Sequence, residues 1–446
     1  RYREPAYLLC NPRAIPAKLE SSPDLLYSAS WRELNVPTFT PSAPPVNAST
    51  IPIEEVLRLD RSADELPEEA AFALIGAHGS TLNDICHTAS QMRDAGKGKT
   101  VTFSPKVFIP LTRLCRDFCS YCTFRQDPAE AGDSLYLTPE EVLGVAKAGQ
   151  RLGCTEALFT LGERPEVRYP EAKEWLAHRG YRTTLEYLTA MCKLVVEETS
   201  LLPHANPGTM SRQEMAALRP YNPSMGLMLE STSPRLYEEG GPHEFAPSKR
   251  PRVRLRTIEI AGELAVPFTT GILIGIGETR MERIDALLAI RKLHAAHGHI
   301  QEVIIQNFRA KPETPMSETP DAPSDELLWT VAVARILLGP DMNLQVPPNL
   351  NSDNYQAYIG AGINDWGGVS PLTIDYVNPE APWPGLAQLT ERTAAEGYEL
   401  KPRLPVYPEY FVGIGRYLDP GLRTNVESLT DQEGYVKGGI QRYAGQ

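Results

Sequence analysis

The sequence lacks any long apolar run. No stretch of about 18 consecutive apolar residues occurs, so we expect no membrane-spanning helix and no membrane partner. The opening segment, RYREPAYLLCNPR, has no apolar core of the kind that a signal peptide carries. It begins with Arg1 rather than Met, and we therefore expect the chain to be a fragment or a processed form.

Basic residues are outnumbered by acidic ones. The 446 residues include 44 Lys and Arg against 56 Asp and Glu, which gives a formal net charge of −12. An acidic chain is a poor general binder of nucleic acid, so we expect no such partner. One local basic run, KRPRVRLR at 249–256, needs its own explanation, and a solvated helix face is the ordinary one.

Cysteine is scarce and unevenly spaced. The number of cysteines, seven, is odd, which argues against the disulfide framework of a secreted protein. The expected location is therefore cytoplasmic, with an organelle address left open. Cys154 and Cys192 fall in or beside predicted helices, where we expect inert core thiols. Three other cysteines lie close together and are the most informative feature of the chain.

Composition divides the chain into four expected regions. Residues 1–63 are rich in Pro and Ser and should be loosely ordered, apart from a short helix near 52–60. Residues 64–99 carry apolar residues at three-to-four spacing, which predicts a helical extension. Residues 100–385 should form the main domain. Residues 386–446 should form a helix and coil extension whose polar, Gly-rich end is typical of a linker.

From Val101 onward, short apolar runs alternate with helical patterns. The candidate strands are 107–112, 156–162, 201–208, 224–231, 268–277, 302–308, 343–348 and 365–371. The helical patterns are 139–152, 183–199, 211–219, 252–264, 279–296, 324–338 and 353–361, with Thr138, Ser211 and Asp353 as candidate N-caps. Such alternation is typical of an α/β protein with a parallel (β/α) barrel, partial or complete. A doubly wound open sheet is the alternative.

Cys115, Cys119 and Cys122 form a C-x3-C-x2-C motif directly after the first predicted strand. Three thiolates of one short loop can hold three irons of a 4Fe–4S cluster and leave the fourth iron for a small molecule. A zinc site would normally need a fourth protein ligand, and Cys154 and His178 lie at no zinc-finger spacing. Catalytic zinc held by three thiolates is a less common alternative.

This motif, with Tyr121 directly before its third cysteine, resembles that of the radical S-adenosylmethionine (SAM) superfamily. The resemblance implies a TIM-type barrel, a 4Fe–4S cluster held by the three cysteines, and SAM bound to the fourth iron. It also implies that the reduced cluster cleaves SAM to methionine and a 5′-deoxyadenosyl radical. Tyr121 would then lie near the adenine of SAM.

Other residues match the superfamily in the expected order. Leu161-Gly162-Glu163 ends the second strand, where the family has a Gly-Gly-Glu that receives the SAM amino group. Leu161 departs from that pattern, so the match is partial. Glu230 and Ser231 end the fourth strand, where the resemblance implies polar contacts to the ribose and amino-acid parts of SAM.

The fifth strand and the basic run complete the implied SAM site. Residues 271–278 match the family's G-x-I-x-G-x-x-E, with Leu273 in place of the middle Ile. The resemblance implies backbone contacts from Gly275 and Ile276 to the adenine. In barrel relatives an Arg near the position of the basic run binds the SAM carboxylate, and Arg250 is the candidate here.

Each of these residues also has an ordinary structural interpretation. Glu163 could be a surface acid, Glu230 a charge at a helix N-terminus, Tyr121 a packing residue and 271–278 a packing turn. They occur together at the carboxyl ends of successive strands, where the active sites of barrels lie. This joint occurrence favours the functional interpretation.

The surrounding segments narrow the resemblance. VFIPLTRLCRDFCSYCTF, TLGERPE, HANPGTMS and INDWGGVSPLT together resemble the cyclising component of 7,8-didemethyl-8-hydroxy-5-deazariboflavin synthase over about residues 64–415. The sister component, which joins tyrosine to a ribitylaminouracil, usually has Phe before the third cysteine, and here Tyr121 favours the cyclising component. In some organisms the two are fused. One half of such a fusion and a free-standing form both fit this chain.

The resemblance implies a lyase that makes a deazaflavin. The radical would take hydrogen from a tyrosine-derived ribityluracil adduct, the central ring would close, and ammonia loss and an oxidation would follow. The implied partners are this small molecule, the sister coupling enzyme or a fused second half, and an electron donor. His204, near the end of the third strand, is the candidate catalytic base, and a structural histidine is the alternative.

Polar residues at the predicted strand ends are candidates for contacts to the uracil and ribityl groups. They are Asn206, Gln306, Asn307, Asn349, Asn351 and Asp365. Trp366 could stack on a flat ring. Because Asn and Asp favour turns, turn formation is the alternative for several of them.

Two other functions fit parts of the sequence. The first is another radical SAM reaction on a related adduct, such as that of the sister coupling enzyme or of a menaquinone-pathway enzyme. The second, from a different class, is a non-catalytic iron–sulfur or zinc-binding module, which would not need Gly162, Glu163 or the 271–278 strand. Colour separates the metals, because a zinc protein is colourless and a 4Fe–4S protein purified without oxygen is brown.

Overall fold

The computed structural model describes residues 51–58, 66–132, 134–412 and 415–443. Most of the region expected to be loosely ordered, 1–63, lies outside these residues. The short helix expected near 52–60 is present as α1 (Ile53–Arg58). Within the described ranges, no helix combines the length and the apolar character that a bilayer crossing requires.

Eight parallel strands close into a complete barrel, so the doubly wound alternative is wrong. Each strand pairs with the next in chain order, and β1 pairs with both β8 and β2. The strands are β1 (Thr100–Pro110), β2 (Glu156–Thr160), β3 (Leu202–Asn206), β4 (Ser224–Gly226), β5 (Phe268–Ile274), β6 (Ile300–Asn307), β7 (Leu344–Gln345) and β8 (Asp365–Val369). All eight overlap the predicted runs. Their carboxyl ends meet at one end of the barrel, here called the rim, and their amino ends form the floor.

The lengths of β1 and β4 differ from the predicted runs. β1 begins at Thr100, because its first half pairs with β9 (Glu399–Pro402), a strand that the sequence pattern did not predict. The β4 ladder ends at Gly226, and the chain rejoins the sheet through a bridge between Glu230 and Ile272. Long-range pairing sets both lengths, and local pattern does not encode it.

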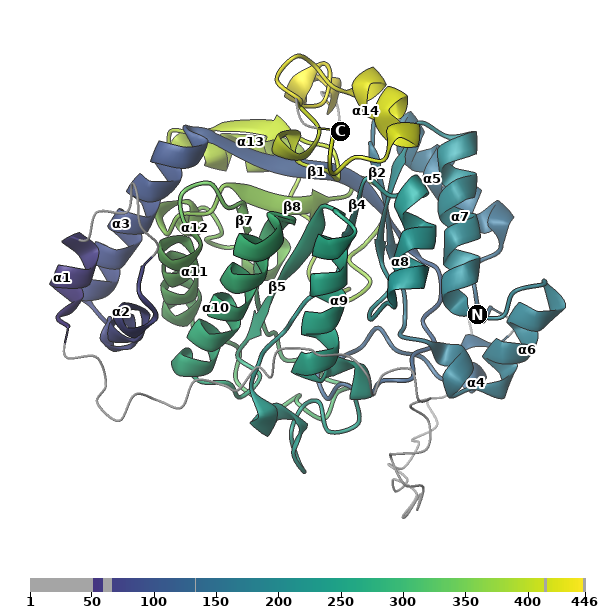
Figure 1. Ribbon diagram of the computed structural model, residues 1–446, viewed down its shortest axis with the longest axis horizontal. Helices are drawn as coiled ribbons and strands as arrows, with labels where there is room; N and C mark the ends of the chain where they lie inside the picture. The colour runs from purple at the N-terminus through teal and green to yellow at the C-terminus, as the bar shows by residue number, and fades with distance from the viewer. Residues whose placement is uncertain (1–50, 59–65, 133, 413–414, 444–446) are drawn as a thin grey trace, which may run out of the picture. The chain divides into compact units, whose positions relative to one another are not determined.

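Helices follow most of the strands and cover the outside of the barrel (Figure 1). They are α5 (Pro139–Arg151), α6 (Pro170–His178), α7 (Thr184–Glu198), α8 (Arg212–Leu218), α9 (Pro251–Glu263), α10 (Arg280–His297), α11 (Ser324–Leu338) and α12 (Ala357–Gly360). Thr138 and Ser211 cap α5 and α8 as predicted. The cap predicted at Asp353 is wrong, because turns occupy the segment before α12 and Gln356 precedes the helix. The sequence pattern did not predict α6.

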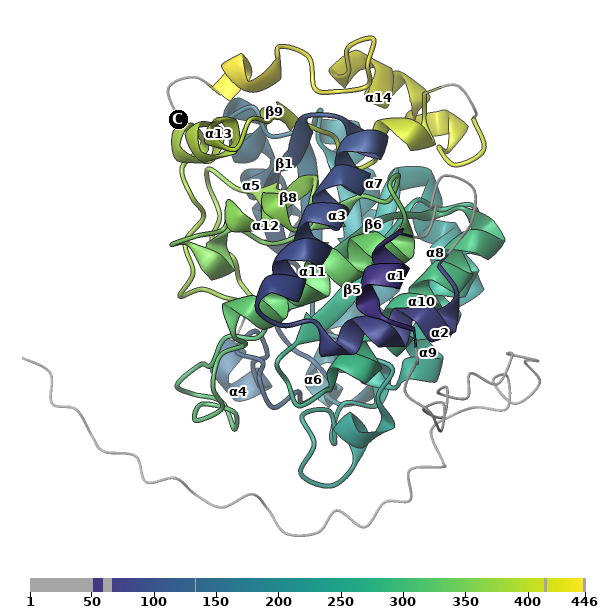
Figure 2. The same ribbon diagram turned by 90° about the vertical axis from the view of Figure 1, so that its left-hand side faces the viewer.

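Two helices before the barrel pack on its outer helices. These are α2 (Glu68–Ala73) and α3 (Ser80–Lys97), and α3 lies against α11 (Figure 2). The buried Arg93 of α3 donates to the carbonyl oxygens of Ile359 (3.0 Å) and Ile363 (2.6 Å). Trp329 of α11 donates its indole N–H to the carbonyl oxygen of Leu74 (2.9 Å). Buried hydrogen bonds therefore fasten this extension to the barrel.

The chain after β8 closes the floor. It contains α13 (Leu386–Ala395), β9 and α14 (Arg423–Leu429), and in Figure 1 α14 lies at the top, opposite α6 at the lower right. The buried Arg403, directly after β9, pairs with Asp365 (2.7 Å) and Glu302 (2.8 Å) inside the barrel. The C-terminal region therefore places the Arg403 cation between a carboxylate of β6 and a carboxylate of β8 at the floor.

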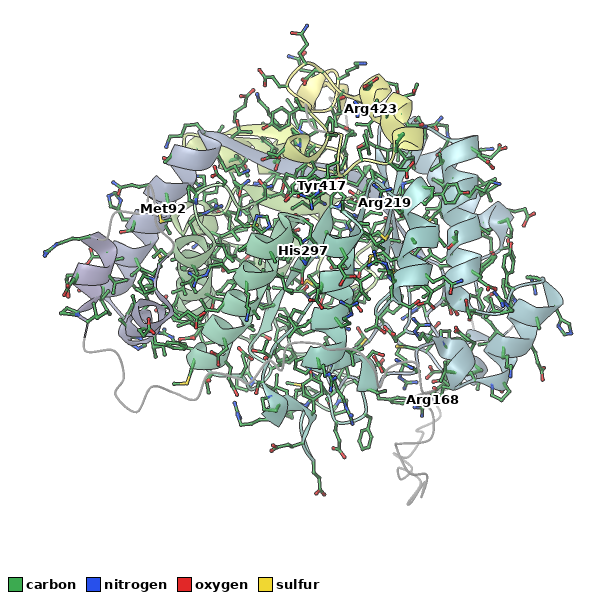
Figure 3. The ribbon with its side chains drawn as sticks, in the orientation of Figure 1. Met92, Arg168, Arg219, His297, Tyr417 and Arg423 are labelled. Atoms are coloured by element: carbon green, nitrogen blue, oxygen red, sulfur yellow. The ribbon has the colours of Figure 1, made fainter. Side chains whose placement is uncertain are left out.

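Two further contacts hold this region against the barrel's outer helices (Figure 3). Tyr417 donates its hydroxyl to the carbonyl oxygen of His297 at the end of α10 (2.9 Å). Arg219, after α8, pairs with Asp419 (3.1 Å).

Substitution of Arg403 should destabilise the barrel. In Arg403→Met two buried carboxylates lose their cation, which costs about 3–5 kcal/mol when one partner of a buried pair is removed. Lys401→Met is the matched control, because Lys401 on β9 forms partly exposed pairs with Glu433 (3.0 Å) and Glu399 (3.6 Å), whose loss should cost less than about 1 kcal/mol. Urea unfolding followed by circular dichroism measures both. Equal losses would contradict the structural role given to Arg403.

Candidate active site

The cysteine loop packs against the carboxyl end of β2. The N–H of Gly162 donates to the carbonyl oxygen of Thr112, and the N–H of Arg116 donates to that of Glu163, both at 2.9 Å. A Cβ on Gly162 would lie 1.9 Å from the carbonyl oxygen of Leu114, so this approach requires glycine. Gly162 therefore fixes where the three cysteines stand relative to β2.

The thiols of this loop are enclosed. Burial raises the pKa of Cys115 to about 12, and the backbone N–H of Glu163 donates to its sulfur at 3.2 Å. Burial also raises the pKa of Cys119 well above its ordinary value, and Lys249 opposes that effect. Cys122 is likewise a free thiol. Half-buried thiols with a raised pKa release their protons readily only when a metal binds their sulfurs.

The arrangement of possible ligands bears on the kind of metal. Among the described residues, no three His, Cys, Asp or Glu side chains converge on a point that suits a single metal ion. One zinc ion would require such convergence. In a 4Fe–4S cluster each thiolate binds its own iron, so the sulfurs stand apart around the cluster. Three free thiols of one short loop suit three irons of such a cluster.

Glu163 is buried beside the loop rather than at the surface, with 5% of its area exposed. Its carboxylate accepts hydrogen bonds from the N–H (3.0 Å) and the hydroxyl (2.5 Å) of Thr209, which follows β3. Arg116 and Arg164 approach it to 3.6 and 3.7 Å. The carboxylate thereby joins the ends of β2 and β3 next to the cysteines.

Glu230 stands in a strained backbone conformation at the rim. Its φ of 69° lies in the left-handed region, which costs a residue other than glycine about 1–3 kcal/mol. Its buried carboxylate pairs with Lys249 and lies 3.7 Å from Arg254. Ser231 is also buried and accepts a hydrogen bond from the N–H of Ser233 (3.1 Å). Strain of this kind is characteristic of functional sites.

The basic run contributes cations other than the predicted one. Arg250 occupies the N-cap position of α9 and is exposed. Arg254, one turn later, is buried and donates to two backbone carbonyl oxygens. Its place in the buried stripe with Ile258 and Ala261 is a helical signal that sequence reasoning could have used. The structure therefore brings Lys249 and Arg254, but not Arg250, into the site.

The turn after β5 is held by Glu278. Its carboxylate accepts from the N–H groups of Gly275 (2.8 Å) and Ile276 (2.9 Å) and pairs with Arg283 (2.7 Å). Ile276 is buried in a small apolar cluster, and Tyr121 packs against that cluster. Tyr121, directly before the third cysteine, therefore packs beside the turn after β5, which we expected to contact the adenine.

Tyr121 also contacts a residue that sequence reasoning missed. Its hydroxyl lies 2.9 Å from Nε2 of His243, and the two rings meet edge to face at 5.6 Å. Burial lowers the pKa of His243 to about 2, so its ring is neutral at pH 7. Nδ1 of His243 is buried with no hydrogen-bond partner in the described part of the chain. No sequence motif marks this histidine, because the long connection after β4 brings it to the site.

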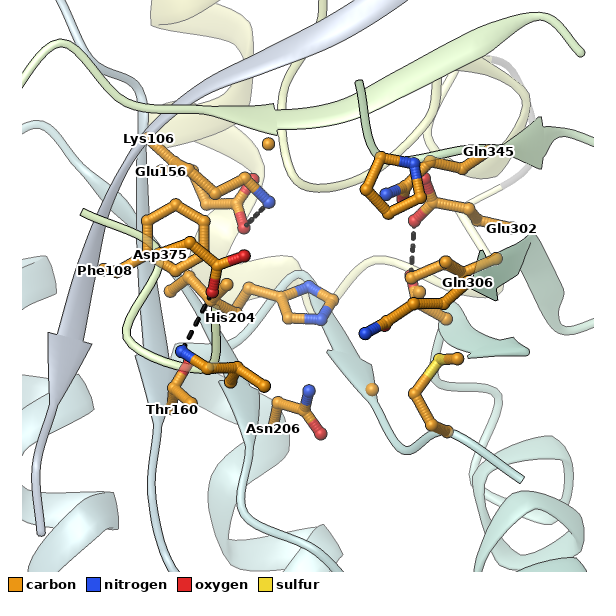
Figure 4. A pocket seen from close by; sticks show the side chains of 18 of the residues that line it. Lys106, Phe108, Glu156, Thr160, His204, Asn206, Glu302, Gln306, Gln345 and Asp375 are labelled. Atoms are coloured by element: carbon orange, nitrogen blue, oxygen red, sulfur yellow. Dashed lines mark hydrogen bonds and ion pairs between the residues drawn. The ribbon is translucent and has the colours of Figure 1, made fainter. Parts of the chain in front are cut away.

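The barrel interior contains a cavity of about 180 Å³ (Figure 4). Barrel interiors are usually filled with branched apolar side chains, but 12 of the 25 residues that line this cavity are polar or charged. The polar lining residues include Lys106, Glu156, Thr160, His204, Asn206, Glu302, Gln306, Gln345 and Asp375. On one wall Phe108 stacks on Trp383 at 5.2 Å. Such a lining indicates a ligand-binding cavity.

His204 lies at the centre of this cavity. Its Nδ1 lies 2.7 Å from the Ser224 hydroxyl, which donates to the carbonyl oxygen of Pro405 (2.6 Å). The Ser224 oxygen must then accept the Nδ1 proton, so Nε2 is the unprotonated nitrogen. Burial lowers the pKa of His204 to about 4, so the ring is neutral at pH 7. Its role as a catalytic base stays a prediction.

The polar residues predicted to contact the substrate fall into two groups. Asn206 and Gln306 line the cavity, and their side chains make no hydrogen bond to any other described residue. The others have structural partners: Asn307 with Asn351 (2.9 Å), Asn349 with Asp375 (3.0 Å) and Asp365 with Arg403.

Two tryptophans, Trp366 and Trp383, line the cavity. Trp366 borders the cavity, but its indole N–H donates to Thr393 of α13 (3.1 Å) and its ring packs on Tyr355. Lys106 and Glu156, paired at 2.7 Å inside the barrel, were also missed. The sequence signal that could have identified Lys106 and Glu156 is a charged residue at the start of an otherwise apolar strand.

The comparisons with known proteins agree with this geometry. A family model described as the radical SAM superfamily matches residues 109–290. FO synthase from Nocardia farcinica is 52% identical over 402 residues, which cover 88% of this chain and 46% of that protein. The 7,8-didemethyl-8-hydroxy-5-deazariboflavin synthase from Methanopyrus kandleri is 55% identical over 337 residues, which cover 76% of this chain and 100% of that protein. The chain thus spans about half the length of the FO synthases.

The fold agrees as well. The FeFe-hydrogenase maturase HydG from Carboxydothermus hydrogenoformans superimposes with a TM-score of 0.63 over 81% of both chains, at 21% identity. At that identity the likeness concerns the fold alone. Together with the full-length match to the Methanopyrus synthase, it confirms the resemblance found in the sequence. The chain belongs to the 7,8-didemethyl-8-hydroxy-5-deazariboflavin synthase family of the radical SAM superfamily.

Proposed function

We propose that this chain is the cyclising lyase of deazaflavin synthesis. Its substrate would be a tyrosine-derived ribityluracil adduct, and its product 7,8-didemethyl-8-hydroxy-5-deazariboflavin, formed by ring closure with loss of ammonia. SAM would be the oxidant, since it ends as methionine and 5′-deoxyadenosine, which carries the hydrogen taken from the adduct. The sister coupling enzyme, or a fused second half, would supply the adduct, and an electron donor would reduce the cluster. The observation that carries the proposal is the cysteine loop docked on Gly162 in a chain that covers the whole Methanopyrus synthase.

Cys115, Cys119 and Cys122 would hold a 4Fe–4S cluster. The donor set fits, because all three are free thiols of one loop and an amide N–H already donates to the sulfur of Cys115. When bound, the cluster and SAM supply a 5′-deoxyadenosyl radical. The chain's own part is to place the loop against β2, enclose it and exclude water.

The residues around the loop would bind SAM. Tyr121, Gly275 and Ile276 would contact the adenine, since the apolar cluster of Ile276 joins them to the cysteine loop. Glu230 and Ser231 would meet the ribose and amino-acid parts of SAM. These contacts explain why the strained conformation of Glu230 is retained.

The remaining polar groups of the rim would bind the ends of the SAM amino acid. Gly162 and Glu163 would receive the amino group, next to the cysteines. Arg254 would face the carboxylate, since it is the buried arginine of the basic run. The lumen below this site would take the substrate, with Asn206 and Gln306 at the edges of its rings.

An anaerobic coupled assay tests the proposed reaction. Reconstituted protein would be incubated with SAM, dithionite, tyrosine, ribitylaminouracil and the sister coupling enzyme. We expect 5′-deoxyadenosine together with the fluorescence of the deazaflavin. In Cys119→Ala the fluorescence should fall to background and the deoxyadenosine to the amount that the coupling enzyme forms alone, because one ligand of the cluster is lost.

The other outcomes of this assay are equally informative. Deoxyadenosine above the amount that the coupling enzyme forms alone, without the fluorophore, would contradict the substrate and retain the radical chemistry. Neither the fluorophore nor this additional deoxyadenosine, from protein with an intact brown cluster, would contradict the enzymatic proposal as a whole.

Substitution of Gly162 should disturb the cluster without unfolding the barrel. In Gly162→Ala the new Cβ would meet the Leu114 carbonyl oxygen, so the loop must move and iron bound per chain should fall several-fold. Gly144→Ala in α5 is the matched control, because a Cβ there meets nothing within 4 Å. Iron and sulfide analysis after reconstitution measures the effect. Full iron content in Gly162→Ala would show that the cysteine loop does not require glycine at position 162.

Three variants compare Arg254 of α9 with Arg250, the N-cap residue of that helix. Arg254→Met should raise the Kd for SAM roughly 10- to 100-fold, the loss expected when a hydrogen bond to a charged group is removed. Arg254→Lys should recover part of the affinity. The exposed Arg250→Met should change the Kd little. Equilibrium dialysis of SAM against reconstituted protein measures all three, and a larger effect in Arg250→Met would assign the carboxylate to Arg250 instead.

A further inference from the structure

The lower part of the barrel cavity presents hydrogen-bonding atoms that no described residue satisfies. Nε2 of His204 is an unprotonated acceptor and has no hydrogen-bond partner among the described residues. Lys106 uses its Nζ only for Glu156, and the carboxamide of Gln345 has no partner in the described ranges. Figure 4 shows the His204 ring between the Lys106–Glu156 pair on one side and Gln345 with Glu302 on the other. Unpaired hydrogen-bonding side chains that face a cavity indicate a place where a ligand binds.

The charges of the cavity exclude an anionic ligand. Its lining contains the cations Lys106 and Arg403 and the carboxylates Glu156, Glu302 and Asp375. Lys106 is paired with Glu156, and Arg403 with Glu302. His204, which faces Glu156, Lys106 and Arg403, is neutral. A phosphate or carboxylate would therefore meet no free cation there, whereas an uncharged group that both donates and accepts would be satisfied.

The depth of these groups below the rim of the barrel indicates that they bind a part of the ligand that does not react. His204 lies two residues before the last residue of β3, about 7 Å below Asn206 at the rim. Ser224 links it to Pro405, which belongs to the segment that closes the floor. The cysteine loop lies at the opposite end, against the carboxyl end of β2. A molecule that reacts beside the loop therefore reaches His204 only with a part remote from the reacting atoms.

The backbone keeps this position open. A Cβ on Gly226 of β4 would lie 2.9 Å from Nε2 of His204, so glycine leaves room beside the acceptor atom.

We propose that the lower part of the barrel cavity, lined by Lys106, His204 and Gln345, is a polyol-binding subsite that takes the ribityl chain of the substrate. This inference rests on the proposed function. Each hydroxyl of the chain can donate to His204 or Gln345 and accept from Lys106 or Gln345. The ring system then stays at the rim, between the cysteine loop and the carboxamides of Asn206 and Gln306. His204 acts here by binding, not as a base.

A pair of deazaflavins tests the subsite. One is the proposed product, and the other carries an unbranched pentyl chain on the same ring in place of the ribityl chain. Their Kd values for anaerobically reconstituted protein are measured from ligand fluorescence. We expect the unsubstituted protein to prefer the ribityl compound by at least about tenfold, because the groups of the subsite are left unpaired by the pentyl chain.

Two variants locate the preference. His204→Phe removes the acceptor and should lower the preference roughly 3- to 10-fold. Gln345→Met should lower the preference as well. Because the Gln345 carboxamide has no described hydrogen-bond partner, this variant leaves no group unpaired, and it still tests the subsite if His204→Phe fails to fold. Trp383→Leu is the matched control, because a wall residue contacts both compounds by apolar area and should weaken both equally.

The outcomes separate this inference from the proposed function. Equal binding of the two compounds to the unsubstituted protein would overturn the subsite and leave the function standing. A preference that survives both His204→Phe and Gln345→Met would also overturn it. Binding of neither compound at millimolar concentration would contradict both the subsite and the proposed function.

Discussion

The close approach of the Leu114 carbonyl oxygen to Gly162 is the constraint on which the site depends. It seats the cysteine loop on the end of β2, so that the next residue, Glu163, donates its N–H to the sulfur of Cys115. Because the strands are parallel and the barrel is closed, the ends of β3, β4 and β5 stand beside the same loop. A side chain at position 162 would separate these parts, whatever the rest of the sequence.

Ionic groups divide the barrel into a structural floor and a reactive rim. At the floor Arg403 neutralises two buried carboxylates, and this pairing accounts for the position of the C-terminal region. At the rim Lys249 and Arg254 surround Glu230, where hydrogen-bonding groups must remain available to a ligand. In the cavity between the two, both lining cations are paired with carboxylates, which suits an uncharged, hydroxyl-rich substrate better than an anion.

The sequence alone predicted the strands and the cysteine loop well, because both are local patterns. Apolar runs separated by helical periods identify a barrel, and three cysteines in one short loop identify a cluster site. It could not predict β9 or the contact of Arg403 with the floor, since both depend on pairing between residues far apart in the chain. It chose Arg250 where the structure buries Arg254, because it did not use the helical stripe that Arg254 shares with Ile258 and Ala261. His243 reached the site through a long loop that has no motif.

The central claim is that the radical formed at the rim takes hydrogen from the tyrosine-derived part of the adduct. The most direct measurement uses adduct made by the coupling enzyme from tyrosine that carries deuterium on its side chain. Mass spectrometry of the 5′-deoxyadenosine would then follow the label. The account predicts that deuterium appears in the deoxyadenosine in step with deazaflavin formation. Deoxyadenosine that forms with the deazaflavin but carries no deuterium would contradict it.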